Sequence, residues 1–284
     1  MSHLILQSPT LNSQNLETIA AMVSADGIQT LKSPTVVRLL NVDSDQREAV
    51  HQACQDMRMD YAFLPEIHLL RECKLLAMDM DSTLITIECI DEIADAVGKK
   101  AEVAAITEAT MRGEIKDFSE SLRQRVALLE GVSEAALQEV YDQRLRLNMG
   151  AERLIKVARQ HGLHTLLVSG GFTFFTQRLK ERLQLDNATA NELEVENGVL
   201  TGKVIGEIID GQAKARRVRE LAQTLDASRE QIIAIGDGAN DLPMMEVAHY
   251  SVAWRAKPVV QQQARFALNY SALDAVLNWF RLSF

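Results

Sequence analysis

The sequence of 284 residues has few cysteines, no excess of positive charge and no apolar run long enough to cross a membrane. Three cysteines, an odd number without a framework spacing, argue against a disulfide scaffold and fit a reducing compartment. The net charge of -9 argues against nucleic-acid binding, because phosphate backbones demand a basic surface. The N-terminal residues lack the basic and apolar regions of a signal peptide. We therefore expect a cytoplasmic protein with no membrane contact.

The first part of the chain, residues 1–68, predicts a small α+β domain. Its alternation of apolar and polar residues predicts the ferredoxin-like order βαββαβ, with strands at 4–6, 28–31, 36–42 and 61–64 and helices at 15–24 and 46–57. We find no glycine-rich loop and no paired catalytic residues before residue 74. The element order resembles that of amino-acid-binding ACT-type domains. We therefore expect a regulatory domain with serine or another amino acid as effector, or a dimerisation module that makes a homodimer.

The remainder, residues 73–284, predicts an α/β domain with a doubly wound parallel sheet, because apolar strands alternate with helices. Between residues 88 and 148 this alternation gives way to four helical runs, at 90–97, 102–110, 118–129 and 134–145. We interpret them as a helical cap inserted into a core of residues 73–87 and 149–284. Farther along the core, Asn197-Gly198 predicts a hairpin within residues 191–207, since this dipeptide favours a type I′ turn.

Polar motifs follow three of the predicted buried strands. Asp79 and Asp81 follow Leu75–Met78, Ser169 and Gly170 follow residues 165–168, and Asp237 follows residues 232–235. Because the carboxyl ends of parallel strands meet at one edge of a sheet, these side chains should lie together.

Their chemistry is that of phosphoryl transfer, which needs a nucleophile, a proton donor for the leaving oxygen and positive charge against the transferring group. Asp79 and Asp81 supply one attacking carboxylate and one proton carrier. A divalent cation held by Asp79, Asp237 and a main-chain carbonyl would offset the repulsion between carboxylate and phosphate, and Mg²⁺ prefers such oxygen ligands. Lys214 adds a fixed positive charge.

The motifs Asp79-Met-Asp-Ser-Thr, Ser169-Gly-Gly-Phe, Lys214 and Gly236-Asp-Gly-Ala-Asn-Asp resemble the four motifs of the haloacid dehalogenase superfamily of phosphatases. Within it, residues 73–270 are similar to the phosphoserine phosphatases. The resemblance implies that an Mg²⁺-dependent enzyme hydrolyses O-phospho-L-serine to L-serine and phosphate, the last step of serine biosynthesis. It implies Asp79 as nucleophile of an aspartyl-phosphate and Asp81 as general acid. It also implies metal binding by Asp79, Asp81 (through its carbonyl) and Asp237, with Asp241 supporting the metal shell. Ser169, Gly170 and Lys214 would contact phosphate, and Asn240 would touch the phosphate or its lysine.

The same resemblance assigns substrate specificity to Glu88 and Arg125. Phosphoserine carries an ammonium group, which Glu88 can pair with, and a carboxylate, which Arg125 can bind through two parallel hydrogen bonds. Met111 and Phe118 match apolar cap positions that would shield the site from water. Without the resemblance, the residues alone do not distinguish Arg125 from Arg123, which the same predicted helix carries.

Three alternatives stay open. One is a phosphatase or phosphotransferase for a related small ester such as homoserine phosphate, since one methylene changes binding by about 1–3 kcal/mol. Another is a signalling module that accepts phosphate on Asp79, although such a module needs neither Asp81 nor a cap. The third is an amino-acid sensor in residues 1–66 that has the phosphatase as its output.

Overall fold

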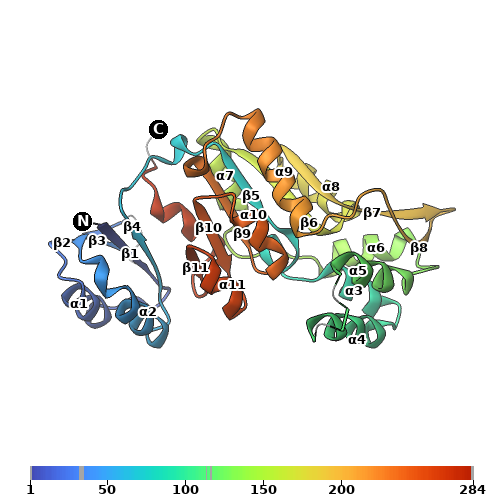
Figure 1. Cartoon of the computed structure of the whole chain (residues 1–284), viewed down its shortest axis with the longest axis horizontal. Coiled ribbons are helices and arrows are strands. Elements are labelled where there is room, and N and C mark those ends of the chain that lie inside the picture. Colours follow the sequence, from blue (N-terminus) through green and yellow to red (C-terminus); the bar gives the residue numbers. More distant parts are fainter. Residues whose placement is uncertain (1, 32–34, 113, 116, 283–284) are drawn as a thin grey trace.

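The computed structural model describes residues 2–31, 35–112, 114–115 and 117–282. Figure 1 shows a small N-terminal sheet at one end of the molecule, a larger sheet in the middle and a group of helices from the middle of the chain at the other end. Among the described residues, no helix combines the length and apolar character that crossing a membrane requires.

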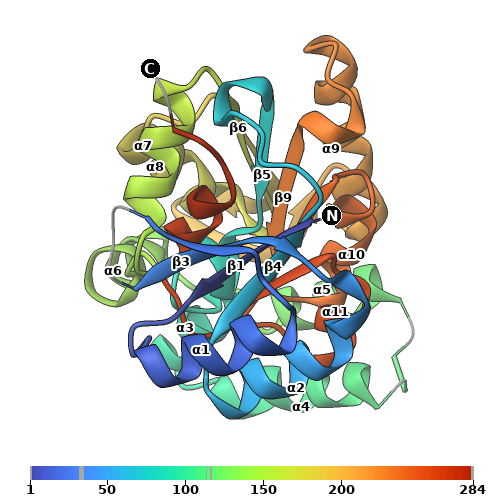
Figure 2. The ribbon, with the colours of Figure 1, turned by 90° about the vertical axis from the view of Figure 1, so that its left-hand side faces the viewer.

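The N-terminal sheet is antiparallel and carries two helices on one face (Figure 2). Its elements follow the predicted βαββαβ order: β1 (Ser2–Gln7), α1 (Ser13–Met22), β2 (Gly27–Thr30), β3 (Val36–Val42), α2 (Arg47–Asp56) and β4 (Asp60–Leu64). The strand order in the described residues is β2-β3-β1-β4. Leu4 and Leu6 pack beneath the helices, whereas Ile5 between them joins the core of the larger sheet, because successive side chains of a strand point to opposite faces.

The larger sheet has the strand order β11-β10-β9-β5-β6-β7-β8 in the described residues. These strands are β5 (Leu75–Met78), β6 (His164–Phe172), β7 (Asn187–Glu196), β8 (Val199–Ile205), β9 (Ile232–Gly236), β10 (Tyr250–Trp254) and β11 (Phe266–Leu268). β8 runs antiparallel to β7, and the other neighbouring pairs are parallel. The expected α/β sheet is therefore present, with an antiparallel hairpin added at one edge.

Helices cover both faces of this sheet. They are α7 (Ala151–Gln160), α8 (Thr173–Leu183), α9 (Gly211–Thr224), α10 (Leu242–Met245) and α11 (Pro258–Gln263). In β5, Leu75 and Ala77 pack against α9 and α10, while Leu76 and Met78 belong to the core that includes α7 and α8. All four residues of β5 are fully buried, which explains why the strand is a continuous apolar run.

The cap consists of α3 (Cys89–Ala96), α4 (Lys100–Met111), α5 (Phe118–Ala127) and α6 (Glu134–Glu139). These helices lie close to the predicted runs, with one difference at the end. The helix predicted at 134–145 stops at Glu139, and the chain continues to Arg144 as a wider π-helical turn.

The hairpin β7–β8 turns at Asn197 and Gly198, which have positive φ angles of 52° and 79°, as the sequence predicts. The hairpin also contacts the cap, which the sequence did not predict. The Gly131 amide donates to the Leu200 carbonyl, and the Leu200 amide donates to the Val132 carbonyl, both at 2.8 Å. The cap is therefore a helical layer joined to the core sheet by backbone hydrogen bonds.

The N-terminal sheet is fixed to the larger one by a shared apolar core and by Asp60. Ile5 of β1 and Ala62 of β4 belong to the same buried core as Trp279 near the C-terminus. Asp60 is 2 % exposed, and its carboxylate accepts hydrogen bonds from three successive backbone amides, those of residues 269–271, at 2.7–3.3 Å. A buried carboxylate bound in this way fixes the loop after β11 against β4.

We predict that Asp60→Ala lowers the free energy of unfolding by roughly 3 kcal/mol, because buried amides lose their charged acceptor. Urea unfolding of the full chain measures this change. Asp56→Ala is the control, since Asp56 is exposed and bonds to Gln52 of its own helix. Equal losses in the two variants would show that Asp60 does not hold the junction together.

Candidate active site

The predicted site residues gather at the carboxyl ends of β9, β5 and β6, which are neighbours in the sheet. A pocket of about 390 Å³ lies between this edge and the cap. From the core it is lined by Asp79, Asp81, Ser169, Gly170, Asp237 and Asn240, and from the cap side by Glu88, Phe118 and Arg125. The structure therefore brings together residues that are up to 161 positions apart, from Asp79 to Asn240.

Lys214 of α9 lies beneath the pocket, where it is completely buried between two carboxylates. Its Nζ donates to Asp79 Oδ1 at 2.5 Å and to Asp241 Oδ1 at 2.7 Å. Burial acts to lower the pKa of Lys214, but the charges of Asp241 and Asp79 outweigh it and raise that pKa above the ordinary value. The lysine is therefore charged and holds Asp79 from below. The predicted contact of Lys214 with phosphate stays a prediction, since Lys214 is not among the pocket-lining residues.

Asp241 organises the loop that carries Asp237. Its Oδ2 accepts the amides of Asp237 at 3.1 Å and Gly238 at 3.0 Å. Gly236 is needed beside it, because a Cβ atom at that position would lie 2.5 Å from the Asp241 side chain. Asp237 in turn accepts a hydrogen bond of 2.8 Å from Thr83 Oγ1, which joins this loop to the segment after β5.

Three carboxylates, those of Asp79, Asp237 and Asp241, have oxygen atoms within 4.8 Å of one another. Burial, followed by the Asp241 charge, raises the pKa of Asp79 well above its usual range and that of Asp237 to about 6. Such crowding of negative charge favours a bound cation, and carboxylate oxygens are the ligands that Mg²⁺ prefers. The residues therefore fit a magnesium ion. Both oxygens of Asp241 already accept hydrogen bonds, so Asp241 fits a supporting position better than a ligand position.

Asp81 belongs to the pocket wall but not to the carboxylate cluster. Burial and the nearby Glu88 carboxylate raise the pKa of Asp81 to about 8. A raised pKa favours the protonated form, which is the form that a general acid requires. The Cys89 amide donates weakly to Asp81 Oδ1, at 3.4 Å. Ligation of a metal through the Asp81 carbonyl stays a prediction.

Ser169 and Gly170 lie inside β6, although the sequence predicts that the strand stops at Val168. The strand continues to Phe172, and its register with β7 shifts between Val168 and Phe172. Ser169 Oγ accepts the Gly171 amide at 2.9 Å. A Cβ atom on Gly171 would lie 2.8 Å from Asp81 Oδ2, so glycine lets this strand approach the acid closely.

The cap side of the pocket carries one acidic and one basic side chain. Glu88 accepts a hydrogen bond of 2.5 Å from Ser82 Oγ, which lies in the segment after β5 at a positive φ of 57°. Arg125 of α5 donates to the Ser121 carbonyl at 3.3 Å through Nε. The prediction for Met111 falls on a side chain that lies outside the described part of the structure.

Asn148 and Asn191 support the site, and the sequence analysis missed both. Asn148 Nδ2 donates to the carbonyls of Ser82, Thr83 and Ile85 at 2.8–3.3 Å, where the chain returns from the cap. Asn191 Nδ2 donates to the Gly170 carbonyl at 2.7 Å, and its Oδ1 accepts the Ile209 amide at 2.7 Å. Neither asparagine belongs to a motif, and each acts on backbone far away in sequence, so no local pattern indicates them.

A sequence profile of the haloacid dehalogenase-like hydrolase family matches residues 76–246. The chain belongs to this family. A second profile, of a domain of unknown function, matches residues 4–50. A phosphoserine phosphatase from Polaromonas sp. is 58% identical over 213 residues, which are 74% of this chain and 90% of that protein.

Solved structures of the family resemble nearly the whole chain. A haloacid dehalogenase family hydrolase from Salmonella enterica serovar Typhi is 31% identical, with a TM-score of 0.89 and 99% of each chain covered. A probable phosphoserine phosphatase from Vibrio cholerae is 35% identical, with a TM-score of 0.84, and the match covers 98% of this chain and 85% of that one. Both matches include the N-terminal sheet. Its resemblance to ACT-type domains stays a prediction.

We predict that Lys214→Met lowers the free energy of unfolding by about 3–5 kcal/mol at pH 8, because two buried carboxylates lose their cation. The loss should be smaller at pH 5. In the variant, protonation of Asp79 in the folded state relieves its repulsion with Asp241. Because the pKa of Asp79 is then higher in the folded than in the unfolded protein, the stability of the variant falls as pH rises.

Urea unfolding at both pH values measures the effect, with Lys156→Met on the exposed face of α7 as control. A loss independent of pH, or one as small as that of the control, contradicts the assigned electrostatic role.

Proposed function

We propose that this hydrolase releases phosphate from O-phospho-L-serine and leaves L-serine, the reaction that closes serine biosynthesis. One observation carries the proposal. One pocket is lined by Asp79, whose carboxylate accepts a hydrogen bond from Lys214, by Asp81, whose pKa is raised, and on the cap side by the acidic Glu88 and the basic Arg125. The Polaromonas relative carries the name of this activity.

Asp79 is the nucleophile of the proposed mechanism. Its carboxylate oxygen attacks phosphorus, the bond from phosphorus to the serine oxygen breaks, and Asp81 gives its proton to that oxygen. Serine leaves, and the phosphoryl group stays on Asp79. Water then attacks phosphorus while Asp81, now ionised, takes the water's proton, and the bond to Asp79 breaks to release phosphate. The raised pKa of Asp81 suits both steps, because the group can give and take a proton near neutral pH.

Lys214 supplies positive charge near the reacting group. Asp79, Asp237 and the Asp81 carbonyl would hold an Mg²⁺ ion, with Asp241 in support. When bound, the ion would reduce repulsion between the carboxylate and the phosphate. Ser169, Gly170 and Asn240 line the same end of the pocket and would donate hydrogen bonds to phosphate oxygens.

Selection of phosphoserine follows from Glu88 and Arg125. The substrate carries an ammonium and a carboxylate beside its phosphate, and both lose water when the cap covers the pocket. Glu88 would bind the ammonium and Arg125 the carboxylate. The Phe118 ring lies so close to Gly170 that a Cβ atom added to this glycine would be 3.1 Å from the ring. The ring would therefore close the pocket over the phosphate end.

We also retain as proposals that the protein is cytoplasmic and that its N-terminal domain binds an amino-acid effector or forms a homodimer. They rest on the sequence, and no contact described above depends on them.

We predict that the protein releases phosphate from O-phospho-L-serine in the presence of Mg²⁺, and that chelation of the metal or Asp79→Asn abolishes release. The asparagine keeps the volume of the side chain but is a far weaker nucleophile. Homoserine phosphate and an aryl phosphate, assayed in parallel, test substrate choice. Preference for homoserine phosphate would favour the related-ester alternative. A stable phosphorylated protein without turnover would favour a signalling module.

We predict that Arg125→Ala lowers kcat/KM for phosphoserine by at least about 100-fold, because the substrate carboxylate loses a charged partner worth roughly 3 kcal/mol. Phosphoethanolamine, which has the ammonium but no carboxylate, should lose much less. Arg123→Ala on the exposed face of the same helix is the matched control. Equal losses on both esters would remove Arg125 from the carboxylate site.

A further inference from the structure

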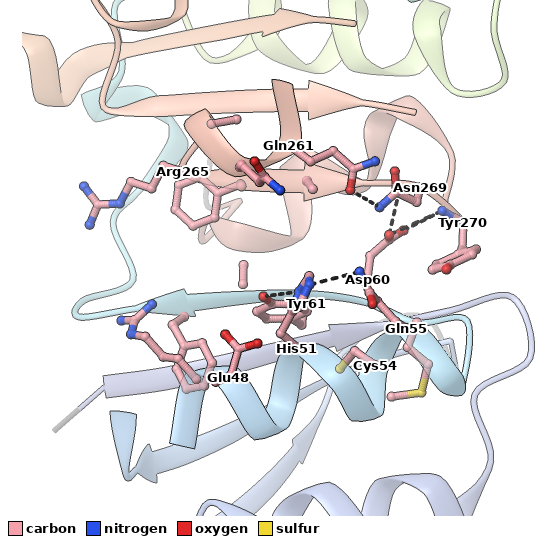
Figure 3. A pocket seen from close by; sticks show the side chains of 18 of the residues that line it. Glu48, His51, Cys54, Gln55, Asp60, Tyr61, Gln261, Arg265, Asn269 and Tyr270 are labelled. Carbon is pink, nitrogen blue, oxygen red and sulfur yellow. Dashed lines mark hydrogen bonds between the residues drawn. The ribbon is translucent and has the colours of Figure 1, made fainter. Parts of the chain in front are cut away.

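A cavity of about 450 Å³ lies where the N-terminal sheet meets the larger one, between α2 and β4 on one side and α11 and β11 on the other (Figure 3). It adjoins a more open cavity, and the two share Gln261, Asn269 and Tyr270 as lining residues. We call the two together the junction groove. Its volume is in the range of small-molecule sites. Among the described residues, it shares no lining residue with the active-site pocket.

The junction groove is rich in positive charge, although the whole protein has a net charge of -9. Four arginines line it, Arg47, Arg58, Arg255 and Arg265, and none of them forms an ion pair with a described carboxylate. Arg265 is already engaged elsewhere, since its Nη1 lies 3.0 Å from His249 Nδ1, which does not line the groove. Two acids, Glu48 and Asp60, also line it. Asp60 is saturated by the three amides of the loop after β11. The groove therefore presents more cations than acids available to pair with them, as an anion site does.

Two of these arginines have unusual backbone conformations. Arg58 has a φ angle of 53° and Arg255 of 42°, in the left-handed region where glycine or asparagine is less strained. The Arg58 guanidinium lies 5.7 Å from the centre of the Tyr270 ring, and that of Arg255 lies 4.8 Å from the Trp254 ring. Cation–π contacts with these rings thus hold both guanidinium groups in place. The N–H groups of the two arginines stay available to a ligand.

A chain of hydrogen bonds adds a donor in the middle of the groove. Gln55 Nε2 lies 2.9 Å from His51 Nε2, and His51 Nδ1 lies 3.0 Å from the Tyr61 hydroxyl, as the dashed line in Figure 3 shows for the latter pair. Because the amide nitrogen donates to Nε2, the proton of the neutral ring lies on Nδ1 and is donated to Tyr61. The hydroxyl hydrogen of Tyr61 is then free to be donated to a ligand.

We propose that the junction groove binds a small dianionic metabolite, with its carboxylate or phosphate groups on Arg58 and the Tyr61 hydroxyl. Figure 3 shows Arg265 and Glu48 toward one end of the cleft, and Asp60, Asn269 and Tyr270 toward the other. Glu48 accepts a hydrogen bond from a hydroxyl or amino group of the ligand. A molecule held here touches both sheets at once, so its binding stabilises their association and raises the melting temperature.

The test uses the full-length protein with Mg²⁺ at low salt and two probes, succinate for carboxylates and methylphosphonate for phosphates. Calorimetric titration and thermal unfolding are measured for wild type, Arg58→Gln and Tyr61→Phe. Arg219→Gln on the exposed face of α9 is the control. Phosphoserine hydrolysis at saturating substrate serves as a check on folding, because neither Arg58 nor Tyr61 lines the active-site pocket.

We expect at least one probe to bind wild type and the control and to raise their melting temperature. In each groove variant the Kd for that probe should be about tenfold higher or more. The phosphatase rate should be unchanged in all of them. Binding of succinate alone identifies a carboxylate ligand, and binding of methylphosphonate alone a phosphate ligand. Failure of both probes at about 10 mM, or binding that the groove variants leave intact, overturns the proposal, and neither result bears on the phosphatase reaction.

Discussion

The ion pairs of Lys214 are the interaction on which the active site depends. A lysine with no exposed surface, placed between Asp79 and Asp241, allows carboxylates to gather at one sheet edge inside an apolar core. Without it, burial and mutual repulsion would raise the pKa of Asp79 still further, because the lysine charge acts to lower it. Asp241 extends the same arrangement to the loop of Asp237 through two backbone amides. The charge of the carboxylate cluster and the position of Asp79 are thus set together.

The site combines residues of the core with residues of the cap side. Asp79, Asp81 and Gly170 lie at strand ends, where hydrogen bonds from Asn148, Asn191 and Thr83 hold the surrounding segments. The groups proposed to select the substrate lie on the cap side, where α5 carries Arg125. Chemistry common to phosphate esters and selectivity for one of them are therefore assigned to different layers of the fold.

The strands and motifs of the site could be predicted from the sequence because they depend on local patterns. Continuous apolar runs indicate strands such as β5 that are buried on both faces, and Asn197-Gly198 indicates the turn between β7 and β8. The supporting asparagines could not be predicted, because an asparagine that binds distant carbonyls looks like any polar loop residue. The continuation of β6 beyond Val168 was missed for a similar reason. Its two glycines indicate a loop locally, while the neighbouring strand and Asn191 hold them in an extended backbone.

The hydrogen bonds between β8 and the cap also limit how the cap can move. A domain connected through two chain crossings can swing about the line that joins them. Here the segment after α5 also forms backbone hydrogen bonds with β8, and β8 is paired with β7 of the core sheet. A movement of the cap about its two chain connections would therefore break these hydrogen bonds unless the hairpin moves with it. Cap and hairpin thus form one mechanical unit against the rest of the core.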